Sequence, residues 1–258
     1  HFPDTLYDGI YSGAHMGILN PFYKCMRRAY RSNNDYDSVD LECICDDYMQ
    51  RCMYSIGCEF NEYLENIPAL DDGRKYTAFY RLFIRKMLNQ NGERTLMGSI
   101  MPPKVGHTHG IMGITFGEDN YSLLLTAAEF ASLPFDFYLK TIGRSNFYAE
   151  TAFMMPYLKG YCSDSMVRRA LLLNALTRNY EELWNSVSVV GNDEWSKVDS
   201  RLDNAMFLPF VKDKKWNFEV GLKNEYARRQ ACVEIDVLSA MALGMTLQQL
   251  KDIYLIQF

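Results

Sequence analysis

The tetrapeptide Asn20-Pro21-Phe22-Tyr23 is the segment of the sequence that comes nearest to a catalytic motif. Amino-methyltransferases use Asn/Asp-Pro-Pro-Tyr/Phe, in which oxygen atoms accept hydrogen bonds from the target amino group and the aromatic ring stacks on the flipped base. Here Phe22 stands where the motif has its second proline, and a Phe-x-Gly-x-Gly loop for a methyl donor occurs nowhere in the chain. We therefore interpret the tetrapeptide as a turn followed by a core aromatic residue, and predict no catalytic residue in this chain.

Two histidines and a run of four cysteines have residue types that could bind a metal ion. His107 and His109 are spaced i, i+2, but no carboxylate or cysteine close in sequence completes a site. The cysteine run lacks the paired knuckles of a zinc ribbon and consists of Cys43, Cys45, Cys52 and Cys58. We expect no metal site. A zinc site in the cysteine run and a metal-dependent hydrolase built on the two histidines stay open as minor alternatives.

Basic residues gather in segments that could contact DNA. Arg27, Arg28 and Arg31 recur at helical or near-helical spacing and could neutralise phosphates. In the segment from Lys140 to Asn146, a glycine gives backbone freedom, while arginine, serine and asparagine can bond base edges. A cation placed against a helix dipole explains Lys140 equally well. The predicted DNA-contacting residues are Lys104, His107, His109, Lys140, Arg144, Ser145, Asn146, Arg27, Arg28 and Arg31.

The composition is that of a globular protein, with 48% hydrophobic and 23% charged residues. An odd number of cysteines, seven, favours free thiols in a reducing cytoplasm over a disulfide framework. The longest apolar runs, at residues 123–128 and 237–245, are too short or interrupted to span a bilayer, and no secretory signal is visible. We expect a cytoplasmic protein without membrane contact. The net charge of −5 does not favour nucleic acid as a partner, although a local basic face is sufficient.

Apolar spacing predicts a helix over residues 75–89, ended by left-handed turn chemistry at Asn91-Gly92. Strands are predicted at residues 95–101 and 110–116, with a flexible loop at residues 102–109 between them.

Four further helices are predicted toward the C-terminus: residues 121–141, 164–187, 224–243 and 247–256. The first has Asn120 as its N-cap and Gly143 as its stop. Thr246 and Gln249 match a capping box at the start of the last one. Residues 191–221 are rich in Asp, Lys and Asn and predict a long loop.

These elements predict an α+β fold that is rich in helix, with a small mixed sheet packed on long helices and a helical C-terminus. We place a boundary near residue 90, where irregular composition gives way to regular elements. It separates an irregular α+β part (1–90) from a part with a helical C-terminus (91–258), unless both form one continuous domain.

Several segments of the sequence also resemble segments of a known family, in the same order along the chain. They are Ser12-Gly-Ala-His-Met-Gly-Ile-Leu-Asn-Pro-Phe-Tyr-Lys24, Thr77-Ala-Phe-Tyr-Arg-Leu82, Gly92-Glu-Arg-Thr-Leu96, Ala131-Ser-Leu-Pro-Phe-Asp-Phe137 and Arg228-Arg-Gln-Ala-Cys-Val-Glu-Ile-Asp-Val-Leu238. On these residues the chain resembles the C-terminal target-recognition region of large bacterial type IIG or type IIS restriction–modification adenine-N6 DNA methyltransferases. It is also similar to the adenine methylase of DISARM phage-defence systems.

The resemblance implies a function in reading DNA sequence. Residues 95–146 look like the recognition domain of TaqI-type enzymes, in which a sheet and a following helix present loops to the major groove. The implied partners are double-stranded DNA and an upstream methyltransferase domain of the parent chain. That domain would hold the catalytic motifs and S-adenosylmethionine, so no cofactor is expected here. The alternative is a protein-interaction or spacer module of the same defence protein, without base contacts.

Overall fold

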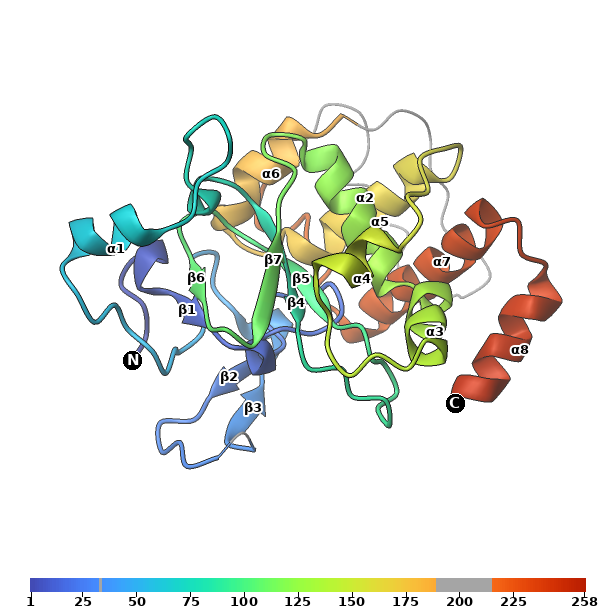
Figure 1. Cartoon of the computed structure of the whole chain (residues 1–258), viewed down its shortest axis with the longest axis horizontal. Coiled ribbons are helices and arrows are strands. Elements are labelled where there is room, and N and C mark those ends of the chain that lie inside the picture. Colours follow the sequence, from blue (N-terminus) through green and yellow to red (C-terminus); the bar gives the residue numbers. More distant parts are fainter. Residues whose placement is uncertain (33, 189–214) are drawn as a thin grey trace.

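A three-stranded antiparallel sheet, of order β5-β4-β7, lies at the centre of the computed structural model of the chain (Figure 1). The structure describes residues 1–32, 34–188 and 215–258. β4 (Arg81–Arg85) pairs along one edge with β5 (Gly98–Met101) and along the other with β7 (Ile111–Ile114). β5 and β7 confirm the predicted strands, each in a shorter form.

The position of β4 shows that the helix predicted over residues 75–89 is wrong. Leu82, Phe83 and Ile84 are buried in succession, which suits a strand covered on both faces. Their apolar spacing also fits a helix, but hydrogen bonds to a strand on each side decide the conformation. Gly98 allows β5 to come this close, because an added Cβ would lie 2.6 Å from the carbonyl oxygen of Phe83. The turn at Asn91-Gly92 therefore ends no helix.

Two smaller pairs of strands are also present among the described residues. β1 (Ile10–Tyr11) runs parallel to β6 (Gly106–His107), so part of the predicted flexible loop is a strand. β2 (Lys24–Met26) and β3 (Tyr36–Ser38) form an antiparallel hairpin.

A layer of helices covers the central sheet (Figure 1). α2 (Asn120–Ala131) packs against β4 and β5, and also against α5 (Ser163–Asn174) and α7 (Glu225–Ala242). Ten residues of α2 and ten of α5 are buried, so these two helices form the middle of the main hydrophobic core.

The helix predicted over residues 121–141 is two helices, α2 and α3 (Leu133–Thr141). Ser132 is extended, with ψ 149°, because Pro134 cannot donate a helical hydrogen bond and its ring would clash with the preceding turn. A carboxylate oxygen of Asp236 accepts the N–H of Leu133 (2.6 Å) and so begins α3. The N-cap of α2 is Asp119 instead of Asn120.

The helix predicted over residues 164–187 is also interrupted. α5 ends at Asn174, a 3-10 turn spans Arg178–Tyr180, and α6 (Glu181–Ser186) follows. The side chain of Asn174 accepts the N–H of Ile100 in β5 (2.9 Å), a contact between distant segments that sequence periodicity does not show.

The C-terminal pair of helices confirms the sequence prediction. α7 is followed by α8 (Leu247–Gln257), and Gly244 between them has φ +70°. Thr246 and Gln249 form the predicted capping box. The remaining helices of the described residues are α1 (Phe60–Asn66), α4 (Ala149–Phe153) and short 3-10 turns at Leu6–Asp8, Gly13–His15, Leu41–Cys43 and Tyr76–Ala78.

The described residues form an α+β fold, as the sequence predicts, with 41% helix against 13% strand, small sheets and a helical C-terminus. β4 lies before residue 90 and is hydrogen-bonded to strands on the far side of that position.

The loop predicted at residues 191–221 lies outside the described residues except for 215–221, which contain no helix or strand. Among the described helices, none combines the length and the apolar character needed to cross a membrane.

Candidate nucleic-acid interface

Two of the predicted DNA-contacting loops meet at the end of β4. The N–H of Lys86 donates to the carbonyl of Gly110 (2.9 Å), and the N–H of Leu88 donates to the carbonyl of Ser145 (3.0 Å). Residues 86–88 are therefore flanked by Gly110, which directly follows one loop, and by Ser145 near the end of the other. We call this place the strand-end surface; its side chains are those of Lys86, Met87, His109, Arg144, Ser145 and Asn146.

The strand-end surface offers several kinds of hydrogen-bonding group to the solvent. His109, Arg144 and Ser145 are exposed, while Asn146 is half-buried and forms a β-bridge with Met87. Imidazole, guanidinium, hydroxyl and amide groups are the types that bond base edges and phosphates. The sequence did not single out Lys86 and Met87, because a helix was expected there. Recognising a buried strand that ends at Arg85 would have placed them at a loop.

The arginines predicted at helical spacing lie in the β2–β3 hairpin instead. Arg27 donates from Nε and Nη2 to Oδ1 of Asp37 (2.9 and 2.7 Å), which neutralises its charge. Asp35 accepts the N–H of Arg31 (2.8 Å), and this backbone bond is the main reason that the pKa of Asp35 is lowered. Arg28 and Arg31 are exposed, and no ion pair joins their side chains to any residue that the structure describes.

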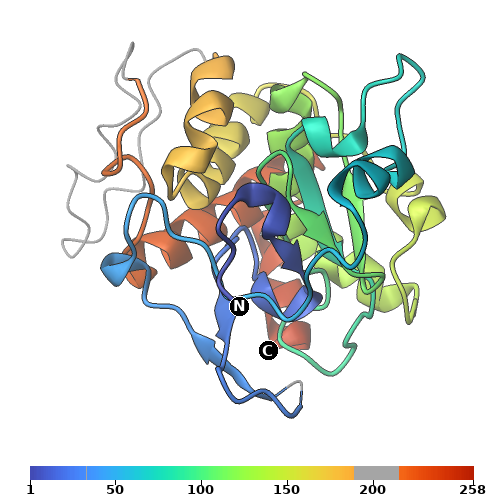
Figure 2. The same ribbon diagram turned by 90° about the vertical axis from the view of Figure 1, so that its left-hand side faces the viewer.

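The hairpin projects from the same side of the molecule as the turn of residues 87–95, as Figures 1 and 2 both show. Its second strand, β3, is fixed to the N-terminal segment. The hydroxyls of Ser12 and Tyr36 lie 3.0 Å apart, and the ring of His15 packs edge-on against that of Tyr36 at 5.1 Å. The hairpin cations and the strand-end surface thus emerge from one supported side.

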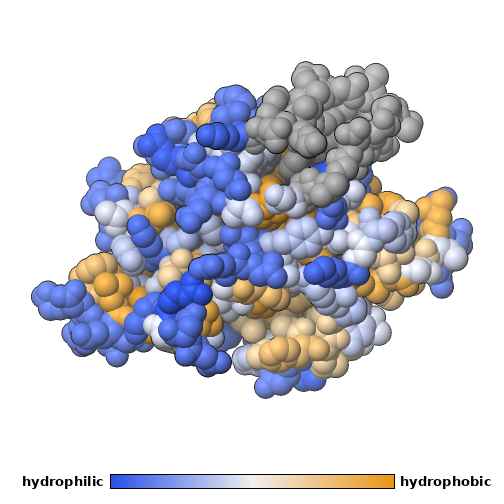
Figure 3. Space-filling view, turned by 90° about the horizontal axis from the view of Figure 1, so that it is seen from above, coloured by the Kyte–Doolittle hydropathy of each residue, from blue (hydrophilic) through white to orange (hydrophobic). Residues whose placement is uncertain are grey.

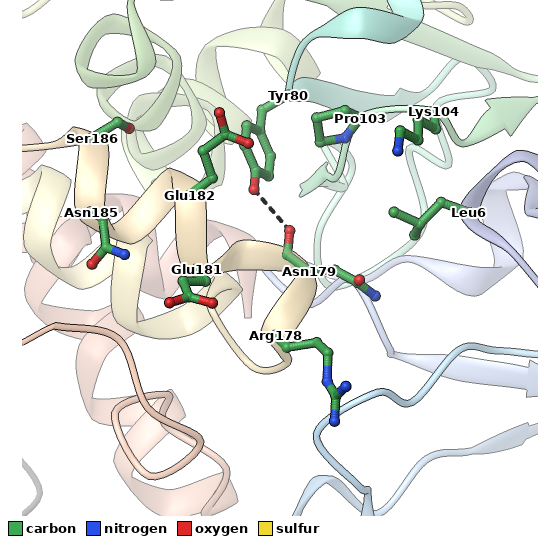
Figure 4. A pocket seen from close by; sticks show the side chains of 10 residues that line it. All are labelled: Leu6, Tyr80, Pro103, Lys104, Arg178, Asn179, Glu181, Glu182, Asn185 and Ser186. Atoms are coloured by element: carbon green, nitrogen blue, oxygen red, sulfur yellow. Dashed lines mark hydrogen bonds between the residues drawn. The ribbon is translucent and has the colours of Figure 1, made fainter.

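Lys104 lies in a different place, at the rim of an open cavity (Figure 4). Its backbone has φ +76°, in the left-handed region that non-glycine residues rarely adopt, and its N–H donates to the carbonyl of Thr77 (2.6 Å). The Nζ atom lies 5.8 Å from the centroid of the Tyr7 ring. No hydrogen bond among the described residues joins Lys104 to the strand-end surface.

The cavity has a volume of about 600 Å³ and an apolar wall with a rim of mixed charge. Tyr80 forms part of the wall; its hydroxyl donates to the carbonyl of Asn179 (2.8 Å), as Figure 4 shows. Arg178 is directed away from the wall and donates to both carboxylate oxygens of Asp46 (2.7 Å each). Two further rim residues, Glu181 and Glu182, are acidic, so the rim does not favour an anionic ligand.

Two other predicted residues are engaged inside the fold. His107 packs edge-on against Phe83 at 4.8 Å, and burial lowers the pKa of its imidazole, so the neutral form is favoured at pH 7. Lys140 donates from Nζ to the carbonyls of Gly92 (2.9 Å) and Glu93 (3.3 Å). Its ammonium group therefore fastens the end of α3 to a turn.

Two arginines of β4 are also internal. Arg81 is 4% exposed, donates to the carbonyl of Val105 and stacks on Phe83 at 4.9 Å. Burial lowers the pKa of Arg81 to about 10. Arg85 donates to the carbonyl of Met16. Their charges are used to satisfy backbone carbonyls, and not to contact a partner.

The tetrapeptide at residues 20–23 forms the expected turn and core contact. The side chain of Asn20 accepts the N–H of Phe22 (3.0 Å), and Phe22 packs edge-on against Tyr48 at 5.4 Å.

Of the cysteine run, Cys52 is buried and the other three are exposed. No group of three or more His, Cys, Asp or Glu residues positioned to hold a metal occurs in the described part of the chain.

Comparison with known proteins adds no relative: the chain matches no family model, no curated protein and no solved structure.

Proposed function

We propose that this chain reads duplex DNA as the target-recognition part of a restriction–modification or phage-defence adenine methyltransferase. One observation carries the proposal: the end of β4 brings together two loops that the sequence singled out separately for DNA contact. The family resemblance stated above supports it as well. The protein would act in the cytoplasm, and an upstream domain would bind S-adenosylmethionine and transfer the methyl group.

The two parts of the interface would have different tasks. Arg28 and Arg31 on the hairpin would contact phosphates, which positions the duplex without reading its sequence. Arg144, Ser145 and Asn146 would reach base edges, where guanidinium and amide groups distinguish bases. The central sheet supports the second part, because residues 86–88 continue a strand that is paired on both sides. The acidic total charge is compatible with this, since phosphate contact needs only a local basic surface.

Salt dependence of duplex binding tests the proposal. We expect the chain to bind a labelled duplex at low salt, with log K falling linearly with log salt. Arg28→Gln with Arg31→Gln should reduce that slope by about 0.9 for each phosphate that is no longer neutralised, because both side chains are exposed. Arg178→Gln is the matched control: this arginine is exposed but paired with Asp46 away from the hairpin. An equal slope in all three proteins, or no binding at low salt, contradicts the proposal.

The exposed apolar residues of α7 and α8 favour a second function, that of a protein-interaction or spacer module. The residues are Val233, Val237, Met241, Leu243, Leu247, Leu255, Ile256 and Phe258. Figure 3 shows hydrophobic side chains gathered at this end of the molecule. Clusters of this kind mark interaction sites. Replacing Arg144 and Asn146 by alanine in the parent protein separates the two functions: altered sequence preference supports reading, and unchanged preference supports a spacer.

A further inference from the structure

A second surface of unusual composition lies next to the strand-end surface, in residues 148–161. We call it the aromatic strap; its exposed side chains are Tyr148, Phe153, Met154, Tyr157 and Tyr161. Phe153 is 89% exposed and Tyr161 78% exposed. Large rings are normally buried because each removes a large apolar area from water. Figure 3 shows a hydrophobic patch over α4, which belongs to the strap.

The rings of the strap point outward because the segment that carries them is hydrogen-bonded to α2 on its inner side. The N–H of Leu158 donates to the carboxyl of Glu129 on α2 (2.6 Å). The hydroxyls of Tyr157 and Ser122 lie 2.7 Å apart. Within α4, Thr151 is buried and faces the interior. The exposed rings are therefore presented by a fixed segment, and a ligand would meet them already in place.

Cations accompany the rings. The Nζ atom of Lys86 lies 5.8 Å from the centroid of the Tyr148 ring. Lys159 is exposed within the strap and Arg144 is exposed just before it. Two exposed acids lie close by: Glu150 in the same segment and Asp119, which interacts electrostatically with Lys159. The strap thus combines flat aromatic faces with nearby cations, a combination that complements an anionic partner with flat apolar groups.

We infer that the aromatic strap binds an unpaired stretch of a nucleic-acid strand, with bases stacked on Phe153 and Tyr161 and phosphates near Lys86 and Lys159. Unpaired bases present planar faces to aromatic rings, and cations beside the rings follow the backbone. The exposed residues of α7 and α8 differ: most are aliphatic, so they offer few faces for stacking. The inference goes beyond the proposed duplex contact and rests on other rings, although Lys86 and Arg144 also belong to the strand-end surface.

Binding of a fluorescein-labelled twelve-nucleotide thymidine strand, measured by anisotropy at low salt, tests the inference. We expect the chain to bind this strand. Phe153→Ala and Tyr161→Ala should each weaken binding at least about fivefold, because each variant removes the ring on which one base stacks. Tyr161→Phe keeps the ring and should bind like the original chain. Phe60→Ala is the matched control, since Phe60 is 43% exposed on α1 at the far end of the molecule (Figure 1).

Several results overturn the inference. The first is that the chain does not bind the labelled strand. The second is that the Phe153→Ala Tyr161→Ala double variant binds it as tightly as the unchanged chain does. The third is that Phe60→Ala weakens binding as much as the strap variants do. A protein contact would show itself differently, as self-association in sedimentation that the double variant abolishes while strand binding stays unchanged. Failure of the duplex proposal can be distinguished from failure of this inference. It would appear as an unchanged salt slope of duplex binding in the Arg28→Gln Arg31→Gln variant, while binding of the single strand by the strap would persist.

Discussion

Glu129 shows how a single buried side chain can make stability depend on pH. It is 1% exposed on α2, and its carboxyl accepts the N–H of Leu158. Burial disfavours the charged form and raises the pKa of Glu129 from 4.5 to about 8, against the opposing effect of that hydrogen bond. The folded chain therefore holds a proton that the unfolded chain has already released.

This difference predicts that the free energy of unfolding falls as pH rises from about 4.5 to about 8. Below that window the carboxyl is neutral in both states and its contribution is fully present. Within it the slope can approach about 1.4 kcal/mol per pH unit. Glu129→Gln keeps the size of the side chain and cannot ionise, so it should flatten the slope. Urea unfolding at several pH values measures both proteins, and parallel pH profiles would show that Glu129 is not responsible.

At the scale of elements, the close approach of β5 to β4 depends on Gly98. An added Cβ would lie 2.6 Å from a backbone oxygen of β4, so one strand must shift and the hydrogen bonds between them must lengthen. The same approach positions residues 86–88, which continue β4 and hold the loops of the strand-end surface. The close packing of β5 against β4 therefore also determines where the loops of the strand-end surface lie.

Gly98→Ala should lower the free energy of unfolding by about 1–3 kcal/mol, the range for overpacking in a tight interior. Gly57→Ala is the matched control, because nothing lies within 4 Å of its added Cβ and its φ is not in the left-handed region. Thermal and urea unfolding compare the two variants. Equal stability of the Gly98 and Gly57 variants would mean that β5 does not need glycine at this position.

At the scale of the whole molecule, residues from both sides of position 90 share one sheet and one core. β4 pairs with two strands that follow it in the sequence, and the main core includes Leu19 as well as Ile235. The guanidinium of Arg228 donates to the carbonyl of Leu19 (3.0 Å), a contact across most of the chain. These shared contacts couple the stability of the two halves.

We therefore expect one unfolding transition, with far-UV and near-UV circular dichroism signals that coincide. A fragment of residues 91–258 lacks β4, so β5 and β7 have no common partner and the fragment should show no cooperative transition. Two separate transitions in the whole chain, or a cooperatively folded fragment, would instead support the boundary near residue 90.

Elements whose signals are local could be predicted from the sequence alone. The boundaries of α7 and α8 follow from Gly244 and from the Thr246–Gln249 capping box, because caps and left-handed glycines act within a few residues. Strands β5 and β7 were predicted from short apolar runs. The fold class was predicted from the combination of helices and strands. The residue types suited to DNA contact were also visible, since guanidinium and amide groups are recognisable without a structure.

Long-range contacts in the folded chain establish which of those residues lie together on a surface. Residues 82–84 form a strand because partners on both sides satisfy their backbone, and α3 begins where Asp236, 103 residues away, accepts the N–H of Leu133. Periodicity within the chain carries no information about such distant hydrogen-bond partners. The same long-range pairing places Arg144 at the strand-end surface, although Lys140 is fastened inside and Lys104 lies at a separate cavity.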